Sequence, residues 1–495
     1  MNMLDYVVDQ TAEYINRMPK EERKKYGQFF TSKESAIFMA SLFRIPENMP
    51  EVYILDPGAG SGILSVALLE RLNEIQSVTD IHLVCYENDV TVAELLQHNL
   101  AWVSSRYQKH FTYEIVNDNY IVSQREAYNA TLSDGVAGRK FDFIIGNPPY
   151  KKISKDAPEA VAMPDVCYGA PNLYFLFASM SLFNLKHDGE MVYIIPRSWT
   201  SGAYFRKFRQ KFLKEASLEH IHLFISRDKV FEKENVLQET IIIKAKKNSL
   251  PSHEIVITTS KSNHDFNDKT LFKAPYTTVV HGKEDYVYLV TNSKDVDTLN
   301  ALHKWNQTLP DIGLKMKTGL TVDFRNRDAL RNEAEEHAVP LFYSQHIKNG
   351  EVIFPAGKEH EYIVTEQRGL LQENKNYLFV KRFTAKEERR RLQCGIYLSK
   401  KYPQYAQIST QNKLNFIDGV KALSECLVCG LYVLFNSTLY DCYYRILNGS
   451  TQVNSTEINS MPVPTIDIIE SMGKKLMTVQ DLSEASCNHI LRSYI

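Results

Sequence analysis

The chain has 495 residues, of which 44% are hydrophobic and 24% are charged, as is ordinary for a soluble globular protein with two or three domains. Its 58 Lys and Arg residues balance 59 Asp and Glu residues, so the total charge gives no support to a nucleic-acid partner, and motifs have to identify the partner. The polar N-terminus and the lack of an apolar run of ~18 residues argue against export and membrane insertion, and we expect a cytoplasmic protein.

Apolar, β-rich runs alternate with helical patterns through the first half of the chain. The runs lie at residues 52–55, 82–86, 141–145, 191–195, 220–225 and 240–243, and helical patterns lie at 63–72, 92–103 and 173–185. This order predicts an α/β fold with a doubly wound, mostly parallel sheet. Ligands bind such sheets at the carboxyl ends of the strands, where the next motifs lie.

The first motif is a glycine-rich turn, Asp56-Pro57-Gly58-Ala59-Gly60-Ser61-Gly62, which leaves a strand and opens a helix. Glycines let the backbone turn sharply and approach a ligand closely. No Gly-Lys-Ser/Thr follows, so a Walker-type phosphate loop is not indicated. A carboxylate before the glycines suits a cationic ligand such as S-adenosylmethionine. The cofactor residues predicted from this turn are Asp56, Pro57, Gly58, Gly60 and Gly62.

Two acids follow the turn in an order that suits the same cofactor. Glu87, after the second strand, can accept hydrogen bonds from both ribose hydroxyls. Asp118, in Asn117-Asp118-Asn119-Tyr120, can accept one from the amine of the cofactor's adenine. The alternative is that each is a solvated acid at a strand end. Their order behind the glycine turn favours the cofactor role.

The run at 141–145 ends in Gly146-Asn147-Pro148-Pro149-Tyr150. An aromatic amine is a poor nucleophile because its lone pair is delocalised into the ring. The Asn147 side-chain oxygen and the Pro148 carbonyl can accept its two hydrogens and localise that lone pair, while the prolines stiffen the loop. Tyr150 can stack on a base that has been flipped out of its duplex. We predict Asn147, Pro148 and Tyr150 as catalytic residues, with Asn147 also contacting the cofactor; the alternative is a proline-rich surface turn.

The second half of the chain lacks the regular alternation. A turn-rich break at 248–252 predicts a catalytic domain at 1–248 and a separate α+β domain at 249–495. Cys426 and Cys429 form a lone C-x-x-C within an apolar stretch, so we interpret them as structural cysteines and expect no metal site. A dense basic cluster, which on a helix could face DNA phosphates, consists of Lys381, Arg382, Lys386, Arg389, Arg390 and Arg391.

These motifs, in this order, resemble the gamma-class DNA adenine-N6 methyltransferases of type II restriction–modification systems, the TaqI-like group. A leading Tyr26-Gly27-Gln28-Phe29-Phe30-Thr31-Ser32 precedes the glycine turn, and a long region follows the catalytic motifs. The basic cluster also faintly resembles PstI-type modification enzymes. The resemblance implies a seven-stranded methyltransferase sheet followed by a target-recognition domain.

The resemblance also implies roles for single residues and for partners. Thr31 would contact the methionine end of the cofactor, and Phe231 would contact the flipped adenine from the side opposite Tyr150. Asn119 departs from the family, which often has an apolar or aromatic residue there. The expected partner is double-stranded DNA, bound by a monomer, and a cognate restriction endonuclease would be a genetic partner that need not bind.

Other functions share parts of this pattern. Enzymes that methylate a glutamine in a release factor also use Asn-Pro-Pro-Tyr, but their additional domain is N-terminal and helical. RNA base methylation stays open, since the pocket residues alone do not separate it. An intact Asn147 and Tyr150 disfavour a catalytically idle specificity subunit. Only 25 residues precede Tyr26, so no fused nuclease domain is expected there.

Overall fold

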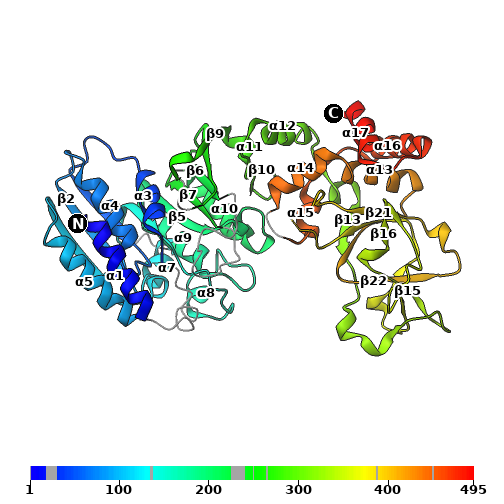
Figure 1. Cartoon of the computed structure of the whole chain (residues 1–495), viewed down its shortest axis with the longest axis horizontal. Helices are drawn as coiled ribbons and strands as arrows, with labels where there is room; N and C mark the ends of the chain where they lie inside the picture. The colour runs from blue at the N-terminus through cyan, green and yellow to red at the C-terminus, as the bar shows by residue number, and fades with distance from the viewer. Residues whose placement is uncertain are drawn as a thin grey trace. The chain divides into compact units, whose positions relative to one another are not determined.

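The computed structural model describes residues 2–17, 30–133, 138–224, 240–248, 250–262, 266–385, 388–448 and 451–495. The chain divides into two compact units, Met1–Thr291 and Asn292–Ile495, called unit 1 and unit 2 below. Figure 1 colours unit 1 from blue to green and unit 2 from green to red. Each unit has its own sheets and its own buried core.

Unit 1 is built on a nine-stranded sheet with the order β3-β2-β1-β4-β5-β7-β6-β8-β9. The strands from β3 to β5 are parallel, and the order reverses beside β1, so the carboxyl ends of β1 and β4 flank a switch point. The strands are β1 (Glu51–Asp56), β2 (Asp80–Tyr86), β3 (His110–Val116), β4 (Phe141–Gly146), β5 (Leu185–Pro196), β6 (Ser217–Phe224), β7 (Thr240–Lys246), β8 (Glu254–Ser260) and β9 (Thr270–Pro275).

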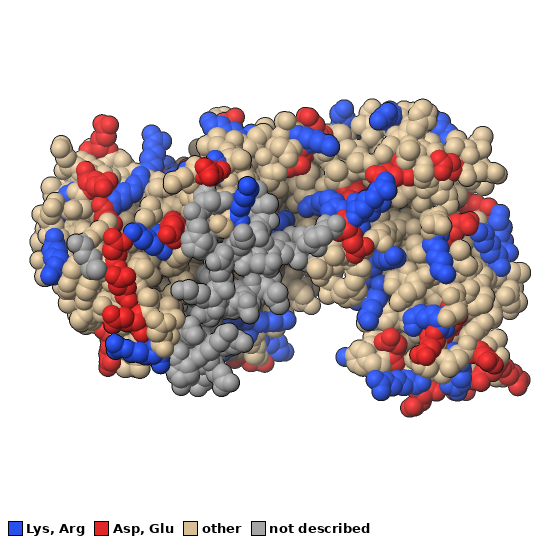
Figure 2. All heavy atoms as spheres, in the orientation of Figure 1, with Lys and Arg blue, Asp and Glu red and all other residues tan. Residues whose placement is uncertain are grey.

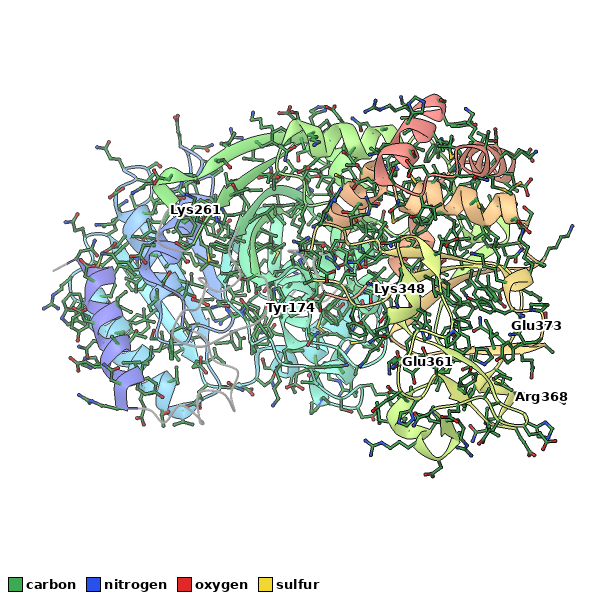
Figure 3. All side chains as sticks on the ribbon, turned by 45° about the vertical axis from the view of Figure 1, so that its right-hand side comes forward. Tyr174, Lys261, Lys348, Glu361, Arg368 and Glu373 are labelled. Atoms are coloured by element: carbon green, nitrogen blue, oxygen red, sulfur yellow. The ribbon has the colours of Figure 1, made fainter. Side chains whose placement is uncertain are left out.

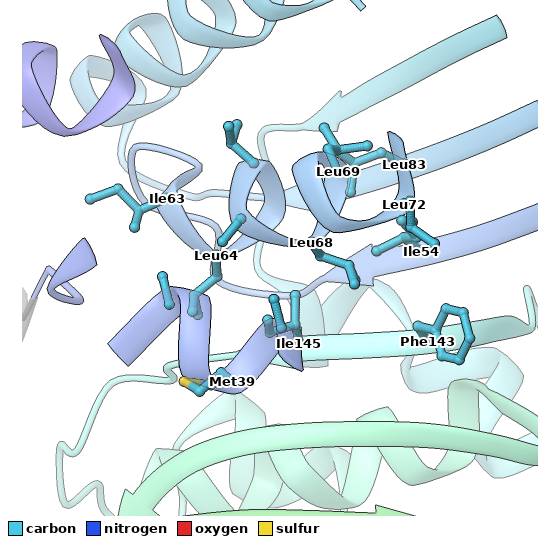
Figure 4. Packing of buried hydrophobic residues seen from close by; sticks show 14 of the residues in the cluster. Met39, Ile54, Ile63, Leu64, Leu68, Leu69, Leu72, Leu83, Phe143 and Ile145 are labelled. Carbon is cyan, nitrogen blue, oxygen red and sulfur yellow. The ribbon is translucent and has the colours of Figure 1, made fainter. Parts of the chain in front are cut away.

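Helices cover both faces of this sheet, which confirms the predicted doubly wound α/β fold. On one face, α1, α3, α4 and α5 bury Leu68 and Met39 against Ile54 and Ile145 of the sheet (Figure 4). On the other face, Tyr193 of β5 is hydrogen-bonded to Ser181 of α9 at 2.5 Å. The helices are α1 (Met3–Arg17), α3 (Lys33–Ser41), α4 (Ile63–Asn73), α5 (Val90–Ser104), α6 (Tyr120–Ser123), α7 (Arg125–Ser133), α8 (Pro158–Ala162), α9 (Leu173–Asn184), α10 (Arg206–Glu215) and α11 (Tyr276–Val279).

The boundary between the units lies later than the break at 248–252 predicts. Strand β8 pairs in parallel with β6, and β9 pairs with β8, so both strands extend the sheet of unit 1. The alternating burial of β8 explains why it belongs there, because Ile255 and Ile257 enter the core. The predicted break therefore falls between β7 and β8, two strands of one sheet, and does not separate domains. The short pair β10 (Val280–His281) and β11 (Tyr286–Val287) also lies in unit 1.

Unit 2 combines strands with helices, as the α+β expectation requires. A six-stranded sheet and a five-stranded sheet contribute to an aromatic core that includes Phe342, Phe379 and Tyr397. Its elements are α12 (Ser293–Leu302), β12 (Gln307–Thr308), β13 (Leu314–Thr318), β14 (Leu330–Arg331), β15 (Val339–Phe342), β16 (Ile347–Lys348), β17 (Glu351–Val352), β18 (Tyr362–Ile363), β19 (Gln372–Glu373), β20 (Tyr377–Lys381), β21 (Cys394–Tyr397), β22 (Gln407–Thr410), β23 (Leu414–Gly419), α13 (Glu425–Phe435), α14 (Thr438–Leu447), α15 (Ser455–Ser460), β24 (Pro462–Val463), α16 (Ile466–Val479) and α17 (Glu484–Leu491).

Helices α13 and α16 cross at two glycines. A Cβ atom built on Gly430 would overlap the Ile469 carbonyl oxygen, and one on Gly473 would overlap the Cys426 carbonyl oxygen. All seven cysteines are free thiols, and Cys429 of the C-x-x-C is buried in α13. None of the helices described is long and apolar enough to cross a bilayer.

Candidate active site

A cavity of about 230 Å³ lies in unit 1 at the carboxyl ends of β1 to β4. It brings together residues from the glycine turn, from the ends of β2 and β3, and from the loop after β4. The residues predicted from the sequence that line it are Pro57, Gly58, Gly60, Glu87, Asp118 and Asn147. Further lining residues are Phe30, Tyr86, Asn88, Asn119, Tyr120, Pro149, Lys151, Glu159, Leu173 and Phe177.

The glycine turn needs glycine at two positions. Gly60 and Gly62 have φ values of +55° and +89°, which other residues adopt only with strain. At Gly62 a Cβ would also lie 2.9 Å from Leu96 of α5. The turn is fixed at its start by a 3.0 Å hydrogen bond from the Ala59 amide to the Tyr86 carbonyl. The backbone of Gly60 thus reaches the cavity in one defined conformation.

Glu87 connects the glycine turn to the next helix. One carboxylate oxygen accepts the Gly60 amide at 3.0 Å, and the other accepts the Asp89 amide at 3.0 Å. Burial raises the pKa of Glu87, and these amide hydrogen bonds oppose that rise. A carboxylate has about four lone-pair sites, so Glu87 keeps acceptor capacity toward the cavity after binding both amides.

Asp56 lies behind the turn and is absent from the cavity lining. Its side chain is fully buried, and one oxygen accepts the Ser65 hydroxyl of α4 at 2.7 Å. Burial raises the pKa of Asp56 to about 7, although the Ser65 hydroxyl and the Gly58 amide lower it. From this buried position Asp56 supports the glycine turn and does not contact the cavity. Gly62 and Thr31 are likewise predicted cofactor residues that do not line this cavity.

The segment after β3 shows why Asn119 differs from the related pattern. The Asn119 side-chain oxygen accepts the backbone amides of Ile121 and Val122, both at 3.1 Å, and so caps helix α6. Its side-chain nitrogen donates to Glu159 at 2.8 Å. Asp118 is exposed and accepts the Asn119 amide at 2.6 Å. Both residues line the cavity.

Asn147 is held at both ends of its side-chain amide. The amide nitrogen donates to the Thr31 hydroxyl at 3.1 Å, and the amide oxygen accepts the Tyr150 hydroxyl at 2.9 Å. The Tyr150 hydroxyl also lies 3.0 Å from the Ile194 carbonyl oxygen. Together these contacts hold the side-chain amide of Asn147 in place. Thr31 therefore supports Asn147 directly.

Tyr150 itself is mostly buried. The residue is 8% exposed, and its ring lies edge-to-face against Tyr174 of α9, with centroids 6.3 Å apart (Figure 3 labels Tyr174). Burial raises the pKa of Tyr150 well above its ordinary value, so the hydroxyl stays protonated as a donor. Pro148 is buried beside it. Phe231, the residue proposed for the other side of a base, lies outside the described residues.

Helix α1 supports this site in a way that the sequence patterns missed. The Thr11 hydroxyl lies 2.7 Å from the Ser61 hydroxyl in the glycine turn, and both residues are buried. The Tyr14 hydroxyl lies 2.9 Å from the Thr91 hydroxyl at the start of α5. The amide and hydroxyl of Thr91 in turn donate to Asp89, whose own amide binds Glu87.

Two arginines of the predicted basic cluster are bound within unit 2. Arg391 is fully buried and donates to the Thr384 hydroxyl at 3.1 Å. Arg390 donates to the carbonyl oxygens of Phe435 and Ser437, at the end of α13, at 3.1 and 3.2 Å. The predicted DNA contact is therefore corrected for both residues, because their guanidinium groups are bound within the fold.

The other residues of the cluster that the structure describes do not lie on a helix. Residues 388–393 lie in an irregular segment between β20 and β21. Lys381 donates to Gln393 at 2.8 Å, and Arg382 donates to the Asn412 carbonyl oxygen at 2.8 Å. Arg389 has an 87% exposed side chain and pairs with Glu484. Lys386 lies outside the described residues.

Comparisons with known proteins find relatives along nearly the whole chain. The family model described as Eco57I restriction-modification methylase matches residues 72–231. The type II methyltransferase M.PstI of Providencia stuartii is 33% identical over 493 residues, which cover 96% of this chain and 94% of the relative. The type II methyltransferase M.BsuBI of Bacillus subtilis is 33% identical over 483 residues, with the same two coverages. Among solved structures, the type IIL restriction-modification enzyme MmeI in complex with DNA covers 99% of this chain and 73% of its own, with a TM-score of 0.55 and 12% identity, which is a likeness of fold.

Proposed function

Because the chain belongs to the family of type II restriction–modification methyltransferases, we propose that it transfers a methyl group from S-adenosylmethionine to the N6 amine of an adenine in double-stranded DNA. The observation that carries the choice of an amine is the geometry of Asn147. Its side-chain amide lies beside the cavity, at the end of β4, and is held there by contacts with the Thr31 and Tyr150 hydroxyls.

The residues around the cavity fit the proposed cofactor. Glu87 retains acceptor sites for ribose hydroxyls, and the exposed carboxylate of Asp118 suits an adenine amine. The positive-φ backbone of Gly60 leaves space that a side chain would fill. When bound, S-adenosylmethionine supplies a methyl group made electrophilic by the sulfonium.

Asn147 and Pro148 then act on the adenine amine. Their oxygens accept its two hydrogens, which localises the nitrogen lone pair toward the methyl donor without a strong base. An amide oxygen has two lone pairs, so Asn147 can accept the amine while it still accepts the Tyr150 hydroxyl. The two prolines restrict the loop and keep both acceptors in place.

A base in duplex DNA has to leave the stack to reach such a loop. We propose that Tyr150 and Phe231 stack on opposite faces of the flipped adenine, each contact contributing about 1–3 kcal/mol. The exposed Arg389 and the half-buried Lys381 and Arg382 of unit 2 remain candidates for phosphate contact, as does Lys386. The protein would act as a monomer and protect host DNA from a cognate endonuclease, which need not bind it.

The alternatives predict other substrates. A protein glutamine methyltransferase or an RNA base methyltransferase could use the same acceptors. The alignment to M.PstI and M.BsuBI extends through both units and favours the DNA function, because it includes the region after the catalytic loop.

The direct test is methylation with tritiated S-adenosylmethionine. Unmodified plasmid DNA, total RNA and a release factor are offered separately, and labelled DNA is digested to nucleosides. We expect label in 6-methyladenine from plasmid DNA alone. Label in a methylcytosine would overturn the adenine assignment, and label only in RNA or protein would overturn the DNA function.

A further inference from the structure

We propose that Lys151, Lys152 and Lys155, together with Tyr204, form a contact surface for the sugar–phosphate backbone of DNA at the mouth of the cavity. This surface is called the lysine edge below. The inference rests on the proposed function and adds to it a set of backbone-binding residues on unit 1, outside the basic cluster of unit 2. All three lysines are exposed.

The lysine edge begins at the residue after Tyr150. Lys151 lines the cavity together with Asn147 and Pro149. The Leu173 amide donates to the Lys151 carbonyl at 2.9 Å, and the Ile153 amide donates to the Pro171 carbonyl at 2.8 Å. An antiparallel bridge between Lys152 and Asn172 lies between these two hydrogen bonds. The backbone of the first two lysines is therefore held against the start of α9, next to Asn147.

Exposed tyrosines accompany the lysines. Tyr204 is 60% exposed, and the Lys152 ammonium lies 5.6 Å from the centroid of its ring. Tyr168 is 58% exposed, and the following Gly169 approaches the Tyr204 ring closely, since a Cβ there would lie 3.6 Å from it. Lysine and tyrosine side chains both donate hydrogen bonds to phosphate oxygens in protein–DNA interfaces.

The lysine edge carries three positive charges. Among the described residues, none of its three ammonium groups takes part in an ion pair. Several other lysines of unit 1 are paired within the unit, as are Lys186 with Asp142 and Lys211 with Asp165 at 2.8 Å. Figure 2 likewise shows basic and acidic side chains interspersed over the face that it draws.

The charged residues that line the cavity, in contrast, are mostly acidic. Its lining contains the carboxylates of Glu87, Asp118 and Glu159, whereas Lys151 is its one ammonium among the described residues. The proposed methyl donor is cationic at its sulfonium, which the acidic lining suits. An extruded adenine remains attached to its own phosphates, so these phosphates must pass the mouth of the cavity. The ammonium groups of the lysine edge, at the mouth of the cavity, would bind these phosphates.

The experiment measures DNA binding as a function of salt. The variant carries Lys152→Gln and Lys155→Gln, and leaves Lys151 unchanged because it lines the cavity. Phosphate contacts carry no sequence information, so a duplex of arbitrary sequence is a sufficient probe. The slope of log K against log salt is negative, and each lost phosphate contact reduces its magnitude by about 0.9. For the two replaced lysines we expect the magnitude to fall by about 1.8, with unchanged cofactor affinity.

Lys273→Gln provides the matched control. Lys273 is an exposed lysine on β9, at the far edge of the same sheet, and we expect its replacement to leave the slope unchanged. An unaltered slope in the double variant would overturn the lysine edge, as would an equal decrease in the control. If the wild-type protein methylates DNA in either case, the proposed function survives that failure. If the wild-type protein methylates no DNA, the proposed function is wrong, whatever the slope of the double variant.

Discussion

The cavity of unit 1 and the arginine-rich segment of unit 2 use charged side chains in opposite ways. In the cavity, Glu87 binds two backbone amides and still faces open space, so its charge is available to a ligand. In the segment, Arg391 is fully buried and Arg390 binds main-chain carbonyls at a helix end. A charge at a strand end next to a glycine turn thus marks a site. A run of like charges alone does not, because the fold decides which members face solvent.

The sharpest test of this comparison is Asn147→Ala in the cavity. Loss of the oriented acceptor should lower kcat by about 10²–10³-fold, the effect of removing one preorganised hydrogen-bonding group from an active site. Cofactor affinity, measured by calorimetric titration, should stay within a few-fold of wild type. Equal losses of turnover and of cofactor binding would show that Asn147 has a structural role.

The comparison predicts a different phenotype for the arginines of unit 2. Arg391→Met should lower the free energy of unfolding by about 1–3 kcal/mol, because it removes hydrogen bonds made by a buried charged group. Arg389→Gln, which changes an exposed ion pair, should cost less than about 1 kcal/mol. Urea unfolding measures both. If Arg391→Met were as stable as wild type and bound DNA more weakly, the comparison would be broken.

The buried Asp56 in unit 1 should affect the free energy of unfolding, as we expect of the buried Arg391 in unit 2. Its pKa of about 7 in the folded protein lies above its ordinary value of 3.8. Between pH 3.8 and about pH 7 the folded state binds the proton more tightly than the unfolded state does. The free energy of unfolding therefore falls as pH rises through this range and levels off above about pH 7. Asp56→Asn removes this titration. Relative to the variant, the wild type should lose about 1.4 kcal/mol between about pH 5 and pH 6. Urea unfolding over this range measures it, and parallel curves would contradict it.

The smallest expected effect concerns helix α1. Thr11→Val removes the hydroxyl that contacts Ser61, so it should weaken cofactor binding by roughly 2–10-fold, equivalent to a single hydrogen bond of about 0.5–1.5 kcal/mol. Thr11→Ser keeps the hydroxyl and should bind the cofactor as wild type does. If the two variants had the same affinity for the cofactor, the contact would not position the glycine turn.

The sequence predicted the parts of the site that depend on local chemistry. The glycine turn, Glu87, Asp118 and Asn147 each follow a strand of the parallel sheet, so the fold alone brings them to one edge. The inward orientation of Arg391 could not be predicted in this way. Its backbone amide binds Asp441, which lies 50 residues away, and a charge pattern does not contain that contact.

The same reasoning explains the misplaced boundary and the residues that were missed. Pro251 and its neighbours read as a break, yet the strand that follows pairs with β6. Phe177 and Leu173 lie in a helical pattern that the sequence predicted, but their contact with the cavity follows from how α9 packs. Their apolar character gave no signal that distinguishes a ligand contact from core packing.

Helix α1 has a consequence for how the protein acquires its fold during translation. The residues that it contacts, Ser61, Thr91 and His98, are synthesised 50, 77 and 92 residues after their partners. Contacts of such long sequence separation form slowly. A nascent chain therefore lacks packing partners for Leu4 and Val7 until α4 and α5 have been synthesised.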